Sequence, residues 1–234
     1  SSADLMVAFV GFEIMSISLY ILIGIGHEQL FSKEAAFKYF ILGSFASAIF
    51  LYGIALMFGT AGTTSLAALA GQSVILSSTN VVFLMGLVLL LVGIAFKVSL
   101  FPFHTWTPDV YQGAPTPISA FMATGVKLVM FTVLIRIATL KMLFVDPRLL
   151  LTLKICAVLT MTVGNISAII QDNVKRILAY SSIAHAGYIM VGIVVAATSK
   201  SPDAAAATLF YLITYSAMNI GALAVVNIIE KDER

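Results

Sequence analysis

Long, mostly apolar runs constrain this chain more than any other feature of its sequence. A helix needs about 20 apolar residues to cross the hydrocarbon core of a bilayer, whereas transmembrane barrel strands alternate in character over about ten residues. The runs are too long and too uniformly apolar for strands, so the sequence predicts an all-α, polytopic bundle of transmembrane helices. The seven predicted spans are Leu5–Ile25, Ala35–Phe58, Asn80–Leu100, Pro117–Leu140, Leu149–Ile170, Val174–Ala197 and Ala204–Ile229.

The composition supports this interpretation. Of the 234 residues, 60% are hydrophobic and 10% are charged, and the mean hydropathy is +1.05. A soluble domain usually carries about 25% charged residues, so the apolar surface of this chain requires a lipid bilayer or other membrane helices as partners. The net charge of +2 gives no argument for nucleic acid binding, and the single cysteine, Cys156, cannot form an internal disulfide.

The spans follow one another without a soluble domain or a low-complexity tract, so residues 1–234 are expected to form a single transmembrane domain. The uncharged stretch between Gly62 and Asn80, rich in Ser, Ala and Gly, is expected to be a linker. The chain starts at Ser1 without a methionine or a signal peptide, and it stops at Arg234 soon after an apolar run. Both ends are therefore expected to be cuts through a longer protein.

The basic residues predict an orientation. Seven spans place alternate loops on opposite sides of the membrane, and cytoplasmic loops carry an excess of Lys and Arg. One side carries Lys33, Lys175, Arg176, Lys231 and Arg234. The other carries Lys141, Arg148 and Lys200, with Lys154 just inside the fifth span. The excess predicts that the first side, which includes the C-terminal end, faces the cytoplasm.

Ionisable residues inside spans are costly, and they tend to mark ion or proton pathways. Glu13 lies near the middle of the first span, too deep for a carboxylate to reach the interface. It must be protonated, paired or hydrated there. A structural hydrogen bond between helices is the alternative explanation.

Lys97 lies near the end of the third span, a few residues before Pro102. Proline cannot donate a backbone N–H and clashes with the preceding turn, so the helix is expected to break near Ser99 to Phe101. Freed carbonyls beside an ammonium group would form a polar site inside the membrane, as in the broken helices of transporters. The alternative is a lysine that extends to the interface from a helix end.

Three further ionisable residues lie within predicted spans. Lys127 is in the middle of the fourth span, where the loss of water around an ammonium group favours release of its proton; a structural ion pair is the alternative. Lys38 lies near the start of the second span and could equally extend to the interface. His185 in the sixth span is a candidate proton relay or a residue that packs helices together.

Other chemistry finds little support. Three scattered histidines and one cysteine do not form a metal-ligand set, and the sequence contains no phosphate-binding loop, nucleophile elbow or dinucleotide fingerprint. We therefore expect no metal, no bound cofactor and no redox centre within this chain.

Three stretches resemble a known family. The segment from Lys97 to Pro117, KVSLFPFHTWTPDVYQGAPTP, resembles the signature of the antiporter-like subunits of respiratory complex I, which share a His/Gln-Thr-Trp-x-Pro-Asp core, and its ending is most similar to the subunit N type. The segments Asp172 to Tyr188 and Tyr211 to Ala222 agree with this resemblance.

The resemblance implies a fold of about fourteen spans, built from two inverted five-helix repeats that each contain one broken helix. The present spans look like the fifth to the eleventh. Residues 5–140 would then hold most of the first repeat and 149–229 the start of the second, and the broken twelfth span with its own lysine would be absent. Such a fragment is not expected to pump protons by itself.

The resemblance also implies roles. Glu13 would be the glutamate of the fifth span, Lys97 the central lysine of the broken helix, Lys127 the connecting lysine and Lys38 a modulating lysine. The implied function is proton translocation as a subunit of NADH:quinone oxidoreductase in the bacterial inner membrane, beside other membrane subunits, with NADH, FMN, Fe–S clusters and quinone bound elsewhere in the complex. Two alternatives remain, a subunit of a multi-subunit cation/proton antiporter and a scaffold that transports nothing.

Overall fold

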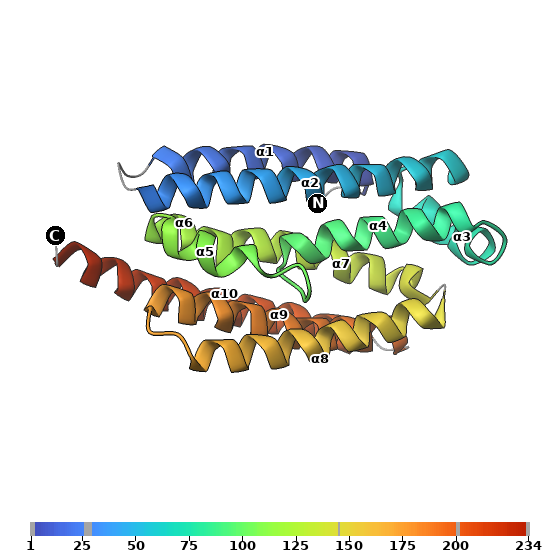
Figure 1. The fold of residues 1–234 in the computed structure, drawn as a ribbon. Coiled ribbons are helices and arrows are strands. Elements are labelled where there is room, and N and C mark those ends of the chain that lie inside the picture. Colours follow the sequence, from blue (N-terminus) through green and yellow to red (C-terminus); the bar gives the residue numbers. More distant parts are fainter. Residues whose placement is uncertain (1–2, 26–29, 145, 200–201, 233–234) are drawn as a thin grey trace.

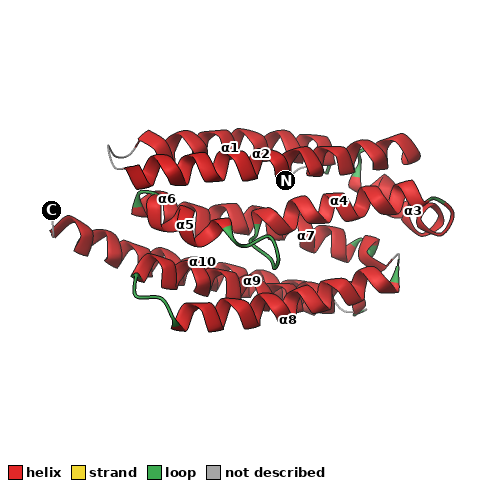
Figure 2. Cartoon of the chain, viewed as in Figure 1, coloured by secondary structure: helices red, strands yellow, loops and turns green. Residues whose placement is uncertain are grey.

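The structure is a computed structural model, and it describes residues 3–25, 30–144, 146–199 and 202–232. Lys200 and Arg234, which were counted in the predicted orientation, lie outside the described residues. Within them the regular elements are helices, apart from one isolated bridge between Asp4 and Ser65 (Figure 2). The α-helices are α1 (Leu5–Ile25), α2 (Leu30–Ala61), α3 (Leu66–Thr79), α4 (Val81–Lys97), α5 (Trp106–Gly113), α6 (Thr116–Phe121), α7 (Lys127–Thr139), α8 (Pro147–Ile169), α9 (Val174–Thr198) and α10 (Asp203–Asp232).

The long helices run roughly parallel or antiparallel to one another in three layers (Figure 1). The pair α1 and α2 forms one outer layer, α8 to α10 form the other, and α4 to α7 lie between them. The C-terminal end of α10 lies at the same end of the bundle as the junction of α5 with α6. The middle layer is thus enclosed by helices on two sides.

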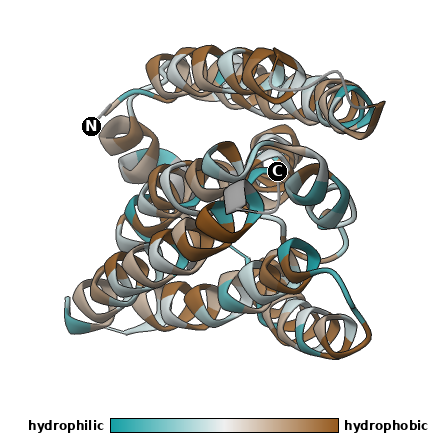
Figure 3. Ribbon diagram, turned by 90° about the vertical axis from the view of Figure 1, so that its left-hand side faces the viewer, coloured by the Kyte–Doolittle hydropathy of each residue, from teal (hydrophilic) through white to brown (hydrophobic). Residues whose placement is uncertain are grey.

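The exterior of the bundle is suited to lipid. Six helical segments of the described chain are long and apolar enough to cross a membrane, and α4 is a shorter apolar helix. Large apolar side chains such as Ile14, Phe45 and Phe210 are exposed on the outer faces of their helices, and apolar residues make up much of each ribbon in Figure 3. The chain is therefore a multi-pass membrane protein, as the sequence predicted.

The third predicted span is broken where Pro102 predicted a break. Helix α4 ends at Lys97, residues 98–105 leave the α-helical path, and α5 resumes at Trp106. Ser99 has a φ of 64°, in the left-handed region, which ends the regular helical path just after Lys97. Lys97 is therefore the last residue of a helix that stops inside the protein, surrounded by other spans.

The prediction of a linker between Gly62 and Asn80 is wrong for most of this segment, because residues 66–79 form the helix α3. Leu66 and Leu69 are almost fully buried, and alanine and leucine have high helix propensity. Burial of this apolar side offsets the cost of ordering the segment. Helix α2 also begins five residues before the predicted Ala35, so Lys38 lies two turns into it.

The broken span packs closely on α2 where two glycines meet. A Cβ atom on Gly53 would lie 2.7 Å from the carbonyl oxygen of Gly86, and one on Gly86 would lie 2.9 Å from that of Gly53. Small residues allow membrane helices to approach this closely. The contact fixes α4 against the first layer and thereby positions its last residue, Lys97.

Candidate functional site

Glu13 faces the second helix of its own layer. Its carboxylate accepts a hydrogen bond of 2.5 Å from the Ser47 hydroxyl of α2, and the side chain is only partly buried. The contact fits the alternative of a hydrogen bond between helices and equally fits a carboxylate that holds a proton.

Lys97 is buried, and its side chain reaches α1. The Nζ atom donates a 2.7 Å hydrogen bond to the Ser16 hydroxyl, which in turn donates to the backbone oxygen of Phe12. Within the described ranges no carboxylate lies within 4.0 Å of Nζ, so Glu13 and Lys97 form no ion pair. Ser16 follows Glu13 by one helical turn, so the two side chains lie on the same side of α1. Because Lys97 extends inward, the structure argues against a lysine that reaches the interface.

The break beside Lys97 is lined with polar contacts. The indole of Trp106 donates to the backbone oxygen of Phe96, which also accepts from the backbone N–H of Ser99 at the end of the helix. The hydroxyl of Thr107 donates to that of Ser99, and both residues are fully buried. The His104 Nδ1 atom is buried in this segment and has no hydrogen-bond partner among the described residues. The break is thus a polar region enclosed by the bundle.

Lys127 is buried more deeply, with 1% of its surface exposed. Its Nζ atom donates to the backbone oxygen of Ser182 at 2.7 Å and to the hydroxyl of the same residue at 2.6 Å. The hydroxyl of Tyr215 in α10 donates to the backbone oxygen of Ala123 at 3.1 Å and shares a hydrogen bond of 2.8 Å with the Ser182 hydroxyl. In the part of the chain that the structure describes, no carboxylate pairs with this lysine, so the alternative of a structural ion pair finds no support.

The turn before Lys127 is a π-helix, Met122–Val126, which the sequence did not predict. A π-helical turn breaks the regular pattern of α-helical hydrogen bonds and often occurs at functional sites. Here the backbone oxygen of Ala123 accepts from Tyr215, so the irregular turn contributes directly to the site around Lys127.

His185 lies one turn beyond Ser182 on α9. Its Nδ1 atom is 2.7 Å from the hydroxyl of Tyr211, and its ring also contacts Tyr188 and Tyr215. The structure therefore brings His185 next to the Lys127 site, where it can both pack helices and exchange a proton through Tyr211.

Lys38 belongs to a different environment. Its Nζ atom pairs with Glu34 at 2.8 Å and with Asp109 at 3.0 Å, and Asp109 also pairs with Arg176 at 2.7 Å. These side chains are partly exposed, and Lys175 and Glu230 form a further pair. Lys38 is thus part of an ion-pair network that ties α5 to α2 and α9, and among the described residues neither Lys97 nor Lys127 forms one of its ion pairs.

Sequence reasoning assigned no role to the hydroxyl groups that hold the ionisable residues. Ser16, Ser47, Ser182 and Tyr215 are buried, and each hydrogen-bonds a lysine, a carboxylate or another member of this set. Their signal in the sequence is weak, because serine is common in membrane helices and often hydrogen-bonds its own helix. Only the packing of spans distant in sequence brings them to the charges.

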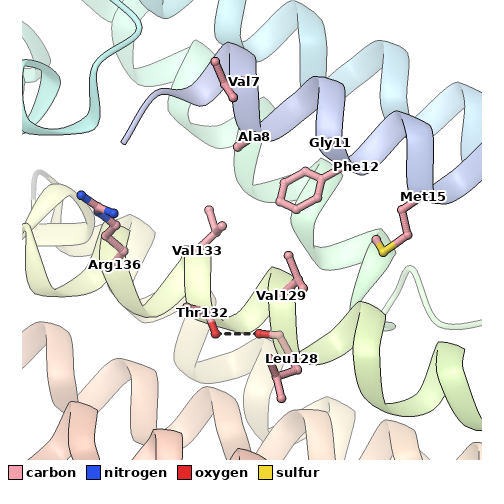
Figure 4. Close-up of a pocket in the computed structure, with 10 residues that line it drawn as sticks. All are labelled: Val7, Ala8, Gly11, Phe12, Met15, Leu128, Val129, Thr132, Val133 and Arg136. Atoms are coloured by element: carbon pink, nitrogen blue, oxygen red, sulfur yellow. Dashed lines mark hydrogen bonds between the residues drawn. The ribbon is translucent and has the colours of Figure 1, made fainter. Parts of the chain in front are cut away.

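A groove of about 480 Å³ between α1 and α7 is a separate feature (Figure 4). Its lining is apolar apart from Thr132, which donates to the backbone oxygen of Leu128, and Arg136 at one end. Neither Lys97 nor Lys127 lines it. The groove is therefore separate from the polar sites around Lys97 and Lys127.

Comparison with known proteins decides the family. Residues 2–234 match the family model described as "NADH:quinone oxidoreductase/Mrp antiporter, TM". The chain belongs to this family. It is 50% identical over its whole length to the NADH-quinone oxidoreductase subunit N of Bdellovibrio bacteriovorus, of which it covers 48%. The chain thus spans about half the length of the curated relatives it matches.

Solved structures agree with the NADH:quinone oxidoreductase/Mrp antiporter family. A chain of respiratory complex I from Thermus thermophilus matches with a TM-score of 0.80 and 40% identity, over 97% of this chain and 47% of that one. A chain of the Mrp complex from Dietzia matches with a TM-score of 0.86 and 25% identity, over 97% and 42%. The resemblance found in the sequence is therefore confirmed at the level of family and fold.

Proposed function

We propose that this chain is part of a proton-translocating membrane subunit of an NADH:quinone oxidoreductase in a bacterial inner membrane. The observation that carries the proposal is the pair of enclosed lysines, Lys97 and Lys127, whose described partners are neutral oxygen atoms. An ammonium group held by hydroxyls and carbonyls away from water can give up its proton at modest cost. A lysine neutralised by a buried carboxylate would hold its proton more firmly.

In this function a proton moves between Glu13, Lys97 and Lys127, and quinone reduction in neighbouring subunits supplies the energy. When Glu13 is ionised it favours a proton on Lys97, and when Glu13 is neutral or withdrawn it favours release. Ser16 couples Glu13 to Lys97, and His185 with Tyr211 extends the proton path beyond Lys127. Lys38 supports this arrangement by holding α2 against α5 through its ion pair with Asp109. NADH, FMN, Fe–S clusters and quinone belong to other subunits of the complex.

The relatives favour this assignment over the two alternatives. The curated relative reported above and two others that are 46% and 48% identical are named NADH-quinone oxidoreductase subunit N. A cation/proton antiporter subunit shares the fold, as the match to the Mrp complex shows, but at lower identity. A scaffold that transports nothing would need buried charges only for packing, and neutral partners give lysines no packing advantage over apolar residues.

The test is proton uptake driven by quinone reduction in membrane vesicles that carry the full complex. We expect Lys97→Ala and Lys127→Ala each to lower the initial rate of proton pumping by about tenfold or more, because each removes a proton carrier. Lys154→Ala is the matched control, since Lys154 is exposed on α8. Assembly is checked on a native gel.

Each outcome discriminates between the functions. Loss of assembly together with pumping in both lysine variants would support the scaffold. Unchanged pumping in assembled complexes would remove both lysines from the proton path. Transport that depends on sodium and continues without quinone would support the antiporter.

A further inference from the structure

Several tyrosines with buried rings lie between the two lysine sites and have no role in the function proposed above. Tyr20 belongs to α1, Tyr39 to α2 and Tyr111 to α5, so they cross from the first layer into the middle one. The rings of Tyr39 and Tyr111 are almost fully buried, and that of Tyr20 is 9% exposed. An apolar membrane interior normally favours phenylalanine at such positions, because each buried hydroxyl needs a partner.

Two of these hydroxyls have no hydrogen-bond partner among the described residues. They are the Oη atoms of Tyr20 and Tyr111, and both are inaccessible from the surface. A buried hydroxyl without a partner costs about 1–3 kcal/mol, so such groups in native proteins usually bind ordered water. Each of these hydroxyls can donate one hydrogen bond and accept others from a neighbouring hydroxyl or a water.

The first of these hydroxyls lies next to the Lys97 site. Tyr20 follows Ser16 by four residues on α1, and Ser16 accepts the hydrogen bond of Lys97. The same hydroxyl faces Gly43 of α2, where a Cβ atom would collide with it. Gly43 thus leaves room for a polar group at this point between two helices.

The second lies next to the Lys127 site. Tyr111 interacts with Ser182 and Tyr215, which surround Lys127, although its hydroxyl makes no hydrogen bond of normal geometry with them. The Ser182 oxygen accepts from Lys127, and the same hydroxyl shares a hydrogen bond with Tyr215. A serine hydroxyl has two lone pairs and one hydrogen. Because the Tyr215 hydrogen goes to Ala123, the Ser182 hydrogen goes to Tyr215, and one lone pair of the Ser182 oxygen is available to Tyr111 or to a water between them.

Contacts between aromatic rings run from Tyr20 to Tyr111. The ring of Tyr20 meets that of Tyr39 edge-on at 4.9 Å between centroids, Tyr39 stacks on Trp106 at 4.8 Å, and Trp106 meets Tyr111 at 6.4 Å. Trp106 itself is fixed by its hydrogen bond to Phe96, at the break of the span.

We propose that Tyr20, Tyr39 and Tyr111 form a relay of hydroxyl groups, joined by water, that conducts protons between the Lys97 site and the Lys127 site. The relay rests on the proposed function, to which it adds the connection between the two lysines. In each step a hydroxyl oxygen accepts a proton from one neighbour and passes its own proton to the next. One proton is therefore transferred along the relay, and no group is oxidised or reduced.

The relay is tested in membrane vesicles that carry the full complex with Tyr20→Phe, Tyr39→Phe or Tyr111→Phe. Phenylalanine retains the ring contacts and removes only the hydroxyl, so we expect assembly to persist and the rate of proton pumping to fall by about tenfold. Tyr52→Phe is the matched control, because Tyr52 lies on the same helix as Tyr39 and is exposed. The ratio of pumping rates in H₂O and D₂O should change in the three variants and remain constant in the control.

A further variant, Gly43→Ala, leaves every tyrosine in place but pushes a methyl group against the Tyr20 hydroxyl. It should slow pumping as Tyr20→Phe does. If the tyrosine variants and Gly43→Ala pump normally while Lys97→Ala and Lys127→Ala do not, the relay is wrong and the proposed function stands. If the lysine variants also pump normally, both are wrong. A Tyr111→Phe complex more stable than wild type, with unchanged pumping, would show that the hydroxyl lies in a dry site.

Discussion

At the scale of single residues, the surroundings of a lysine separate the candidates. Lys97 and Lys127 donate to serine hydroxyls and a carbonyl inside the bundle, whereas Lys38 pairs with two carboxylates, and 41% of its side chain is exposed. A charge that is both paired and hydrated keeps its proton and stabilises structure. The enclosed lysines are therefore suited to carry protons, and Lys38 is suited to hold helices together.

Asp109 provides a test of that structural role. Its carboxylate pairs with Lys38 and Arg176, so Asp109→Asn would weaken two contacts that tie α5 to α2 and α9. Because the pairs are partly exposed, each contributes about 0.2–1 kcal/mol, and we expect the variant to lower the free energy of unfolding by about 1 kcal/mol. Thermal unfolding of the purified complex in detergent measures the change.

Asp146→Asn is the control for Asp109→Asn. Asp146 caps α8 by accepting from the backbone N–H of Arg148, and asparagine can make the same cap. An unchanged melting temperature in Asp109→Asn would contradict the structural role. A loss of pumping without any loss of stability would place Asp109, and with it Lys38, in the proton path instead.

At the scale of elements, the N-terminal end of α1 is latched to the start of α3. The backbone N–H of Leu5 donates to Thr64, and that of Leu66 donates to Ala3. The Asp4 carboxylate accepts from the Thr64 hydroxyl and from two backbone N–H groups in the first turn of α1. This latch joins the layer that carries Glu13 to the segment that precedes the broken span.

The latch should depend on pH. The hydrogen bond from Thr64, assisted by those from Val7 and Met6, holds the pKa of the Asp4 carboxyl below its ordinary value of 3.8, against the opposing effect of desolvation. Because the folded form has the lower pKa, the contribution to stability is complete well above pH 3.8 and is lost as the pH falls through the folded value. Hydrogen exchange of the Met6 and Val7 amides, corrected for intrinsic rates, should therefore accelerate in acid.

Asp4→Asn separates titration from other effects of acid, because asparagine still accepts hydrogen bonds but does not titrate. Protection of the Met6 and Val7 amides in this variant should not change over the same pH range. If wild type and variant lose protection together, the Asp4 carboxyl is not the source of the pH dependence.

At the scale of the whole molecule, basic residues lie at both ends of the helical bundle. Arg176 and Asp172 lie near the start of α9, whereas Lys141 and Arg148 flank the junction of α7 with α8 at the other end of the bundle (Figure 1). The excess of basic residues at the first end predicts that it faces the cytoplasm.

Single cysteines test this orientation. In a Cys156→Ser background, Asp172→Cys and Arg148→Cys place thiols at exposed positions on opposite ends. A maleimide that cannot cross membranes should label Asp172→Cys only in inside-out vesicles and Arg148→Cys only in right-side-out vesicles. The reverse pattern would invert the predicted orientation, and labelling of both from one side would contradict the arrangement of the spans.

The sequence by itself determined the membrane class, the spans, the break after Lys97 and the family. These follow from local properties, because about 20 apolar residues must form a helix in lipid and a proline must interrupt it. The charges Glu13, Lys97 and Lys127 were visible for the same reason, since an ionisable residue within an apolar run is conspicuous. The division into repeats at 5–140 and 149–229 stays a prediction.

Only the tertiary structure decided what surrounds each charge. Ser16 meets Lys97 across 81 positions of sequence and Ser182 meets Lys127 across 55, and a run of apolar residues contains no record of which faces of two helices touch. The same holds for α3, whose uncharged sequence rich in Ser and Ala forms a helix because Leu66 and Leu69 find a buried surface. Packing between distant spans placed the unpartnered hydroxyls of Tyr20 and Tyr111 beside the two lysine sites. The sequence did not show this proximity, because each tyrosine is separated from its lysine along the chain.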